Sequence, residues 1–238
     1  MHGFRMSEKS FTQILEETTE QCRTLEAPLA ERLQIVANKV RELAPGFADV
    51  VDRMVARLAS SGVGRGAPEP GEVMPDFLLP DQDGKLVRLS DLTAKGPVVI
   101  SINRGHWCPY CQLNADALAK IAPDLEALGA QIVAITPELQ RYSRELKDYA
   151  KAPFPILADV DGAYALEIGL LFWVGDEKRQ AMKAGGFDIE PYQGNETWML
   201  PVPATFILGA DGRIKARYIN PDYRQRMPIE ELMTALRS

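Results

Sequence analysis

The sequence predicts an α/β domain with a central sheet flanked by helices, preceded by a helical N-terminal extension. Two observations carry this prediction. From near Val73 onward, short apolar and β-branched segments alternate with helical stretches, which is typical of a sheet with parallel strands. Residues 7–61 instead carry apolar side chains three and four positions apart, the spacing of amphipathic helices.

The extension is expected to span residues 1–62. Its three apolar stripes are separated at Pro28 and Pro45, because proline interrupts a helix interior. The stretch that follows is rich in Gly, Pro and Ser, so we expect a linker at 63–72 and the main domain at 73–238. The helices either pack their stripes onto the main domain or form the interface of a homodimer, and the sequence leaves both open.

The main domain alternates strands with helices. PVVISIN is apolar and β-branched enough for a buried strand, and a helix and the strand QIVAIT follow it. Strand, helix, strand predicts a parallel pair with a right-handed crossover. The turn ADG joins two later strands as a hairpin. Residues 173–200 follow no regular pattern. The expected strands are 85–89, 97–103, 131–136, 155–158, 203–209 and 213–220, and the expected helices are 109–128, 140–149, 162–169 and 228–236.

The composition favours small molecules or other proteins as partners. The chain has 238 residues, a formal net charge of −6 and a pI near 5.1. Nucleic acids and anionic membranes select basic surfaces, so we expect neither as a partner. The stretch MHGFRMSEKSFTQ lacks the apolar core of a signal peptide, and no run is long enough to span a bilayer. We therefore expect a cytoplasmic protein, in which a close cysteine pair is catalytic or metal-binding.

Such a pair lies in the stretch RGHWCPYC, between a predicted strand and a predicted helix. Unpaired backbone N–H groups and the positive end of the helix stabilise a thiolate there. We therefore predict that Cys108 is acidic and exposed, with Cys111 one turn further along and within disulfide reach. Arg104 adds positive charge, Gly105 lets the backbone bend, and Trp107 shields one side of the sulfur.

Zinc binding is the main alternative for the pair, because C-x-x-C supplies half of a four-ligand site. The other half is missing: besides carboxylates only Cys22, His2 and His106 remain, and none has the spacing of a second ligand pair. We expect no metal and no cofactor. Cys22 lies on the apolar stripe of the first predicted helix, where a free cysteine packs as a small hydrophobic residue.

Aromatic and histidine side chains around the pair have two interpretations each. His106 is either a base for the thiols or a spectator that points to solvent, and we favour the spectator. Trp173, Tyr192 and Trp198 either cover the dithiol or belong to the core, and we favour the core.

WCPYC after a parallel strand resembles the active site of the thioredoxin superfamily, and CPYC is similar to the tetrad of glutaredoxins. In LPVPAT, Pro203 resembles the cis-proline that faces the dithiol across that fold. The stretches EVMPDFLLPDQDGKLVRLSDL, GPVVISINRGHWCPYC, LGAQIVAITPE and VPATFILGADGRI together resemble the peroxiredoxin-like branch of the alkyl hydroperoxide reductase and thiol-specific antioxidant family. The resemblance implies a thioredoxin-like fold with an N-terminal hairpin, and antioxidant thiol chemistry.

Carried over residue by residue, the resemblance places Cys111 on the peroxidatic Cys of a typical peroxiredoxin and Cys108 on its Thr. Arg104 falls on its Pro, and Pro203 on an Arg that a later strand brings in. Three of the four positions depart from the family pattern. Because the Thr and Arg of those enzymes polarise the peroxide, we hypothesise that Arg104 supplies the missing charge from another direction.

Two enzymatic mechanisms remain open, with different attacking sulfurs. In a peroxidase, one thiolate reduces a hydroperoxide and becomes a sulfenic acid, the other cysteine closes the Cys108–Cys111 disulfide, and an outside thiol, a thioredoxin-like protein or glutathione, resets the pair. In a disulfide reductase, Cys108 attacks a substrate disulfide. A third hypothesis is a redox-sensing binding protein without turnover. The resemblance favours the thiol-dependent peroxidase.

Overall fold

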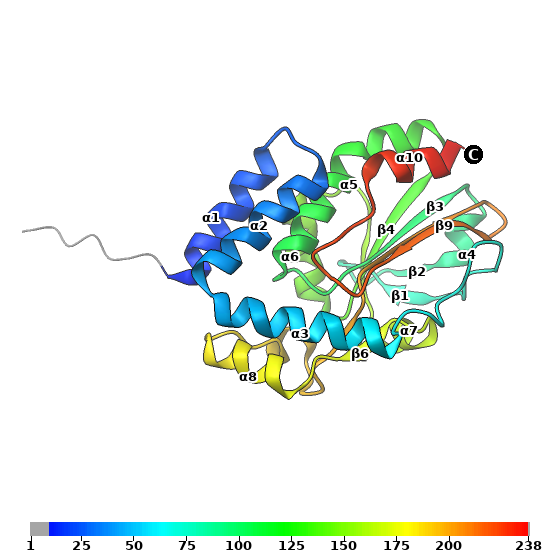
Figure 1. The fold of residues 1–238 in the computed structure, drawn as a ribbon. Coiled ribbons are helices and arrows are strands. Elements are labelled where there is room, and N and C mark those ends of the chain that lie inside the picture. Colours follow the sequence, from blue (N-terminus) through cyan, green and yellow to red (C-terminus); the bar gives the residue numbers. More distant parts are fainter. Residues whose placement is uncertain (1–9, 238) are drawn as a thin grey trace, which may run out of the picture.

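The computed structural model describes residues 10–237, and its centre is a five-stranded sheet with strand order β5-β4-β3-β8-β9 (Figure 1). β3 is parallel to β4 and β4 to β5, whereas β8 is antiparallel to both of its neighbours. The predicted α/β class and the parallel crossover pair are therefore confirmed. The strands are β3 (Val98–Ile102), β4 (Gln131–Thr136), β5 (Ile156–Ala158), β8 (Ala204–Leu208) and β9 (Ile214–Ile219).

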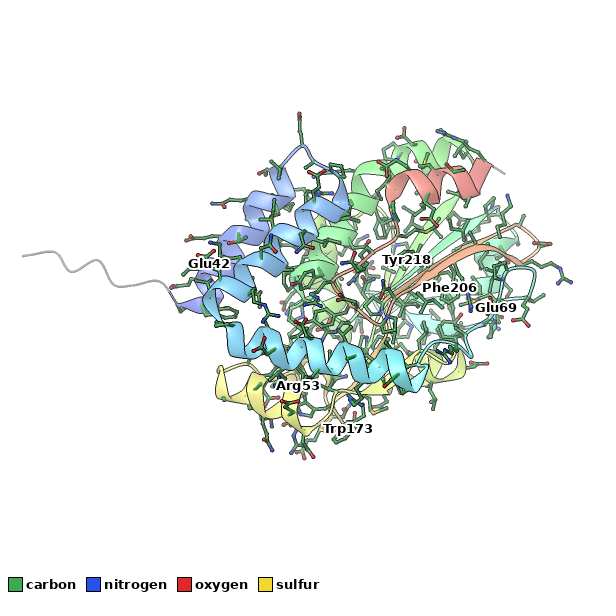
Figure 2. The ribbon with its side chains drawn as sticks, in the orientation of Figure 1. Glu42, Arg53, Glu69, Trp173, Phe206 and Tyr218 are labelled. Atoms are coloured by element: carbon green, nitrogen blue, oxygen red, sulfur yellow. The ribbon has the colours of Figure 1, made fainter. Side chains whose placement is uncertain are left out.

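Both faces of the sheet are buried, each under its own apolar cluster. Successive residues of a strand point to opposite faces and so belong to different clusters. One face packs against three helices: α5 (Pro109–Ala127), α6 (Gln140–Ala150) and α10 (Ile229–Arg237). Val99 lies on this side, while its neighbours Val98 and Ile100 contribute to a second apolar cluster on the other. The second cluster also contains Phe206, which is fully buried at the centre of the sheet (Figure 2).

The predicted helical extension is three helices, α1 (Phe11–Thr24), α2 (Leu29–Leu43) and α3 (Pro45–Ser61). Pro28 caps the start of α2 and Pro45 opens α3, as expected for prolines at helix beginnings. α1 and α2 pack on α5, whereas α3 crosses the lower side of the molecule beside α8, the helix Asp176–Ala184 (Figure 1). Their apolar stripes thus join the core of the main domain. Residues 1–9 of the expected extension lie outside the described residues.

Residues 62–72 form turns that are hydrogen-bonded to β9. The backbone N–H of Gly71 donates to the carbonyl of Ile214, and Arg217 donates to the carbonyls of Ala67 and Pro68. An antiparallel hairpin follows, with β1 (Leu78–Pro80) and β2 (Leu86–Arg88), and the short helix α4 (Leu89–Thr93). The hairpin implied by the family resemblance is therefore present.

The segment that the sequence left unassigned consists of very short elements. β6 and β7 pair antiparallel, and two helices lie between them. α8 is polar on most of its surface, which is why its sequence, DEKRQAMKA, shows no clear apolar stripe. The elements of this segment are β6 (Leu171–Trp173), α8 (Asp176–Ala184), α9 (Glu190–Gln193) and β7 (Met199–Pro201). Before it, η1 (Val160–Gly162) and α7 (Ala163–Glu167) lie where the helix at 162–169 was predicted.

Pro203 lies between β7 and β8, and the peptide bond before it is trans. All other peptide bonds of residues 10–237 are trans as well. The expectation of a cis-proline is wrong. The chain runs extended from one strand into the next, with Val202 donating to the carbonyl of Leu170 and Ala204 paired with Ile102. This path accommodates the trans isomer, which is the intrinsically preferred one. Within the same residues, no helix is both long and apolar enough to cross a membrane.

Candidate active site

The two cysteines lie where the sequence places them, at the turn from β3 into α5. Cys108 is the N-cap of α5 and Pro109 its first residue. The carbonyl of Cys108 accepts hydrogen bonds from the N–H groups of Cys111 and Gln112, at 2.9 and 3.0 Å. Both cysteines are in the reduced, free thiol state. The turn therefore presents a dithiol at the positive end of a helix.

A buried carboxylate holds the backbone of this turn in place. Glu138, just after β4, accepts from the backbone N–H of His106 at 2.7 Å, and its second oxygen lies 2.7 Å from Nδ1 of the same residue. Gly105 has φ +145°, and a Cβ there would lie 2.4 Å from the Trp107 ring and 2.7 Å from Glu138. Only glycine fits, so the predicted bend is confirmed.

The same contacts settle the position of His106. Its ring stacks on Tyr142, meets Tyr192 edge-on, and places Nε2 3.3 Å from Glu145. It does not simply point to solvent, which corrects the spectator interpretation. The pKa of Glu138 is raised, because the effect of burial is larger than the opposing effect of the contacts with His106. We conclude that His106 and Glu138 position the active-site turn.

Both thiols are buried, which contradicts the prediction of an exposed Cys108. Cys108 is 1% exposed and Cys111 0%. The cover comes from the turn itself and from the loop between β9 and α10: the Arg104 guanidinium stacks 3.8 Å from the ring of Tyr223 and 5.0 Å from that of Trp107. The predicted shielding by Trp107 is thus part of a larger cover, whose loop component lies more than a hundred residues away in the sequence.

The acidic thiol is Cys111 and not Cys108. The Cys111 sulfur accepts from Nη2 of Arg226 at 3.2 Å and from the backbone N–H of Arg104 at 3.3 Å. Burial opposes ionisation, but the hydrogen bond from Cys108 and these donors outweigh it and lower the pKa of Cys111 to about 5. Burial and the neighbouring Cys111 raise the pKa of Cys108, whose sulfur lies 3.9 Å from Nη1 of Arg104.

Two buried guanidinium groups therefore flank the dithiol. Arg104 is 1% exposed and Arg226 6% exposed. Sequence reasoning identified Arg104 and missed Arg226, which lies in the irregular stretch between β9 and α10. No motif or periodicity marks that stretch, so only the tertiary structure reveals its guanidinium at the sulfur.

A family model described as the AhpC/TSA family matches residues 70–217. The chain belongs to this family. Peroxiredoxin 2 of Thermoplasma acidophilum is 33% identical over 129 residues, which cover 47% of this chain and 62% of the relative. A peroxiredoxin of Thermoplasma volcanium is 30% identical and covers 47% of this chain and 61% of its own length. The chain thus spans less than two thirds of the length of these relatives.

Solved structures show the same fold. The crystal structure of peroxidoxin BcpB from Mycobacterium tuberculosis has a TM-score of 0.55 and 22% identity, covering 71% of this chain and 97% of that one. A cysteine-to-serine mutant of the peroxiredoxin 6 of Arenicola marina has a TM-score of 0.55 and 18% identity, covering 71% and 72%. The predicted thioredoxin-like, peroxiredoxin-type fold is confirmed.

In this AhpC/TSA family member, four of the five predicted site residues lie in one cluster and the fifth, Pro203, lies at the same end of the sheet. Cys108, Cys111, Arg104 and Trp107 form the dithiol cluster described above. Pro203 is buried at the same end of the sheet, because the next residue pairs with the last residue of β3. By the family resemblance, Pro203 occupies the position of an Arg in typical peroxiredoxins, so this position carries no positive charge here. Arg226, from the loop between β9 and α10, places a guanidinium at the Cys111 sulfur instead.

The three aromatic residues of the 173–200 segment lie in different environments. Trp198 is fully buried and donates from Nε1 to Glu190, so the core interpretation is right for it. Trp173 is 44% exposed and points outward at the edge of the molecule (Figure 2), so for this residue the core interpretation is wrong. Tyr192 joins the aromatic group around His106, and Phe187 connects that group to Trp107 at 5.4 Å.

Proposed function

We propose that this chain is a thiol-dependent hydroperoxide reductase in which Cys111 is the attacking sulfur and Cys108 the resolving one. The observation that carries the proposal is the contrast between the two sulfurs. Cys111 accepts from the Arg226 guanidinium and from a backbone N–H, which stabilise a thiolate, whereas Cys108 keeps its proton. Family membership and the peroxiredoxin names of the relatives support the same activity.

The first step is attack of the Cys111 thiolate on the terminal oxygen of a hydroperoxide. The S–O bond forms while the O–O bond breaks, so sulfur is oxidised to a sulfenic acid and the peroxide is reduced. The leaving oxygen departs as hydroxide or alkoxide and takes up a proton to become water or alcohol. The thiolate charge thereby moves to the leaving oxygen, where the guanidinium groups of Arg104 and Arg226 stabilise it.

The second step closes the disulfide. The Cys108 sulfur attacks the Cys111 sulfenic acid, the S–S bond forms, and water leaves with the proton of Cys108. Arg104 Nη1, the guanidinium nitrogen 3.9 Å from the Cys108 sulfur, is placed to stabilise negative charge as that proton departs. Two equivalents of an outside thiol, from a thioredoxin-like protein or glutathione, then restore the dithiol. A reducing cytoplasm would supply such thiols.

The burial of the pair favours peroxides over protein disulfides as substrates. A disulfide of another protein must bring its sulfur into line with the attacking one, and neither cysteine here is more than 1% exposed. A hydroperoxide is small enough to enter after a modest movement of the Trp107 and Tyr223 cover. The disulfide reductase mechanism would also need Cys108 as the thiolate, and burial raises the pKa of that residue.

Stopped-flow mixing of pre-reduced protein with one equivalent of hydrogen peroxide tests the proposal. Wild type is expected to lose both thiols much faster than free cysteine and to form an intramolecular disulfide. Cys108→Ser should still react quickly but stop at the sulfenic acid, whereas Cys111→Ser should react no faster than free cysteine. Fast oxidation of Cys111→Ser together with slow oxidation of Cys108→Ser would overturn the assignment.

A further inference from the structure

The dithiol cluster contains more positive than negative charge. Within residues 10–237, no carboxylate forms an ion pair with Arg104 or Arg226. The nearby carboxylates are already engaged, since Glu138 binds His106 and Asp222 binds Arg224. The Cys111 thiolate therefore faces two guanidinium groups alone. Because a buried charge is costly unless it is paired, one positive charge remains to be balanced.

The same cluster has hydrogen-bond donors without acceptors. Nε of Arg104, Nε of Arg226 and Nε1 of Trp107 are among the buried polar atoms of the described residues that have no hydrogen-bond partner, and these three belong to side chains that surround the dithiol. Arg226 contacts the Cys111 sulfur, Arg104 contacts the Cys108 sulfur, and the Arg104 guanidinium lies 5.0 Å from the centre of the Trp107 ring. Because buried donors are almost always satisfied in native proteins, unpartnered donors on these three neighbouring side chains indicate a ligand with acceptor oxygens. The donors come from the turn before α5 and from the loop before α10, which together cover the dithiol.

A lysine on α8 shows the same imbalance. Lys178 is 2% exposed, and its Nζ lies 3.4 Å from the centre of the Phe47 ring, with no carboxylate or carbonyl accepting from it in the part of the chain that is described. Burial lowers the pKa of Lys178, and the Arg104 charge lowers it further. The Arg104 contribution shows that Lys178 and Arg104 are close enough for their charges to repel each other.

We propose that Arg104, Arg226 and the indole N–H of Trp107 form an anion subsite beside Cys111, and that the preferred oxidant is a small hydroperoxide bearing a carboxylate. The carboxylate would accept from the free donors and balance the second guanidinium, leaving its peroxide group beside the thiolate. This inference rests on the proposed peroxidase activity for its oxidant, but binding of the anion itself can be measured without any turnover.

The substrate test uses two hydroperoxides of equal shape. tert-Butyl hydroperoxide is neutral, and 2-hydroperoxy-2-methylpropanoate replaces one of its methyl groups with a carboxylate. Wild-type protein is expected to react with the carboxylate compound faster, on the order of tenfold, because a charge-assisted hydrogen bond to guanidinium is a strong one. Equal rates, or a faster reaction of the neutral compound, would overturn the proposal.

Variants locate the preference. In Arg104→Met the ratio of the two rates should fall to about one, whatever happens to the absolute rates, because the charge that the carboxylate balances is gone. Arg224→Met is the matched control: Arg224 is two residues from Arg226, but Asp52 and Asp222 already neutralise it. Its ratio should stay at the wild-type value. If Arg224→Met loses the preference and Arg104→Met keeps it, the subsite is not the one proposed.

A binding measurement separates this inference from the proposed function. Isothermal titration calorimetry of the reduced protein with the unreactive 2-hydroxy-2-methylpropanoate should show binding, and tert-butanol should show none. Cys111→Ser should bind the anion more tightly, because the competing thiolate charge is removed. Absence of anion binding to wild type and to this variant would contradict the subsite even if peroxide is reduced. Anion binding without fast peroxide reduction would support the subsite and contradict the proposed function.

Discussion

Helix α5 contributes to two charge clusters, each with a buried acidic group beside buried arginine, and the two clusters have different roles. In its middle, Asp116 is surrounded by cations: Arg32 at 3.2 Å, Lys120 at 2.8 Å and Arg23 at 3.9 Å. At its N-terminus, Arg104 and Arg226 are buried with no carboxylate in ion-pair contact within residues 10–237. In the first cluster the cations face a carboxyl group, and in the second they face a thiol that becomes negative only when it loses its proton.

The two clusters have different roles. The Asp116 cluster joins α5 to α1 and α2, because Arg23 and Arg32 come from those helices and their guanidinium groups lie 3.9 and 3.2 Å from the Asp116 carboxyl group. The dithiol cluster leaves its positive charge available, so it stabilises a thiolate and whatever charge develops during oxidation. One cluster stabilises the fold and the other stabilises a reactive group.

The largest expected effect comes from breaking the structural cluster. Asp116→Asn leaves Arg32 buried without its anion, and breaking a buried ion pair in this way costs about 3–5 kcal/mol of unfolding free energy. Urea unfolding followed by circular dichroism measures this loss. Asp124→Asn, an exposed position on the same helix, is the control and should change the unfolding free energy by less than about 0.5 kcal/mol. Loss of less than about 1 kcal/mol in Asp116→Asn would show that the cluster is not a structural bond.

The next largest effect comes from removing a cation at the dithiol. Arg226→Met deletes a hydrogen bond to a charged sulfur, worth about 1.5–3 kcal/mol, so the pKa of Cys111 should rise by about one to two units. The unfolding free energy should fall as well, because the carbonyls of Tyr223 and Gln225 lose their donor and the folded state no longer holds the pKa of Cys111 as low. Thiolate absorbance against pH measures the shift. An unchanged thiol pKa would show that the guanidinium contact does not stabilise the thiolate.

The pH profile distinguishes the clusters without mutation. The pKa of Cys111 is lowered to about 5, so its thiolate is fully formed at neutral pH and is lost as the pH falls through that value. The second-order rate with hydrogen peroxide should therefore be flat near neutrality and fall about tenfold per pH unit in more acid solution. A rate that instead rises through the range of an ordinary cysteine, near about 8.5, would contradict the lowered pKa.

The smallest expected effect concerns the support of the turn. Glu138→Gln keeps the shape of the side chain but weakens its bonds to the backbone and ring of His106. Neutral hydrogen bonds contribute about 0.5–1.5 kcal/mol each, so the peroxide rate should fall by less than about tenfold and the pKa of Cys111 should stay nearly constant. A loss as large as that of Arg226→Met would place Glu138 in the chemistry of the sulfur and not only in the positioning of the turn.

The backbone turn that carries the two cysteines could be predicted from the sequence, because it depends only on residues that are adjacent in the chain. A β-branched run followed by Cys-Pro at a helix start specifies where β3 ends, where α5 begins and how far apart the cysteines lie. The acidity of the thiols was assigned to the wrong residue, since it depends on Arg226, which reaches Cys111 from a loop with no regular pattern. Burial of the pair also depends on that loop, through Tyr223. Local spacing contains no information on either contact.

We infer that Cys111, and not Cys108, is the thiolate of the resting protein. NMR of the reduced wild type labelled with ¹³Cβ-cysteine, titrated with acid and base, tests it directly, with each signal assigned from single Cys→Ser variants. We expect the Cys111 signal to titrate near pH 5 while the Cys108 signal remains that of a thiol through neutral pH. A Cys108 signal that titrates at acid pH, with Cys111 still protonated at neutrality, would show that Cys108 is the thiolate instead.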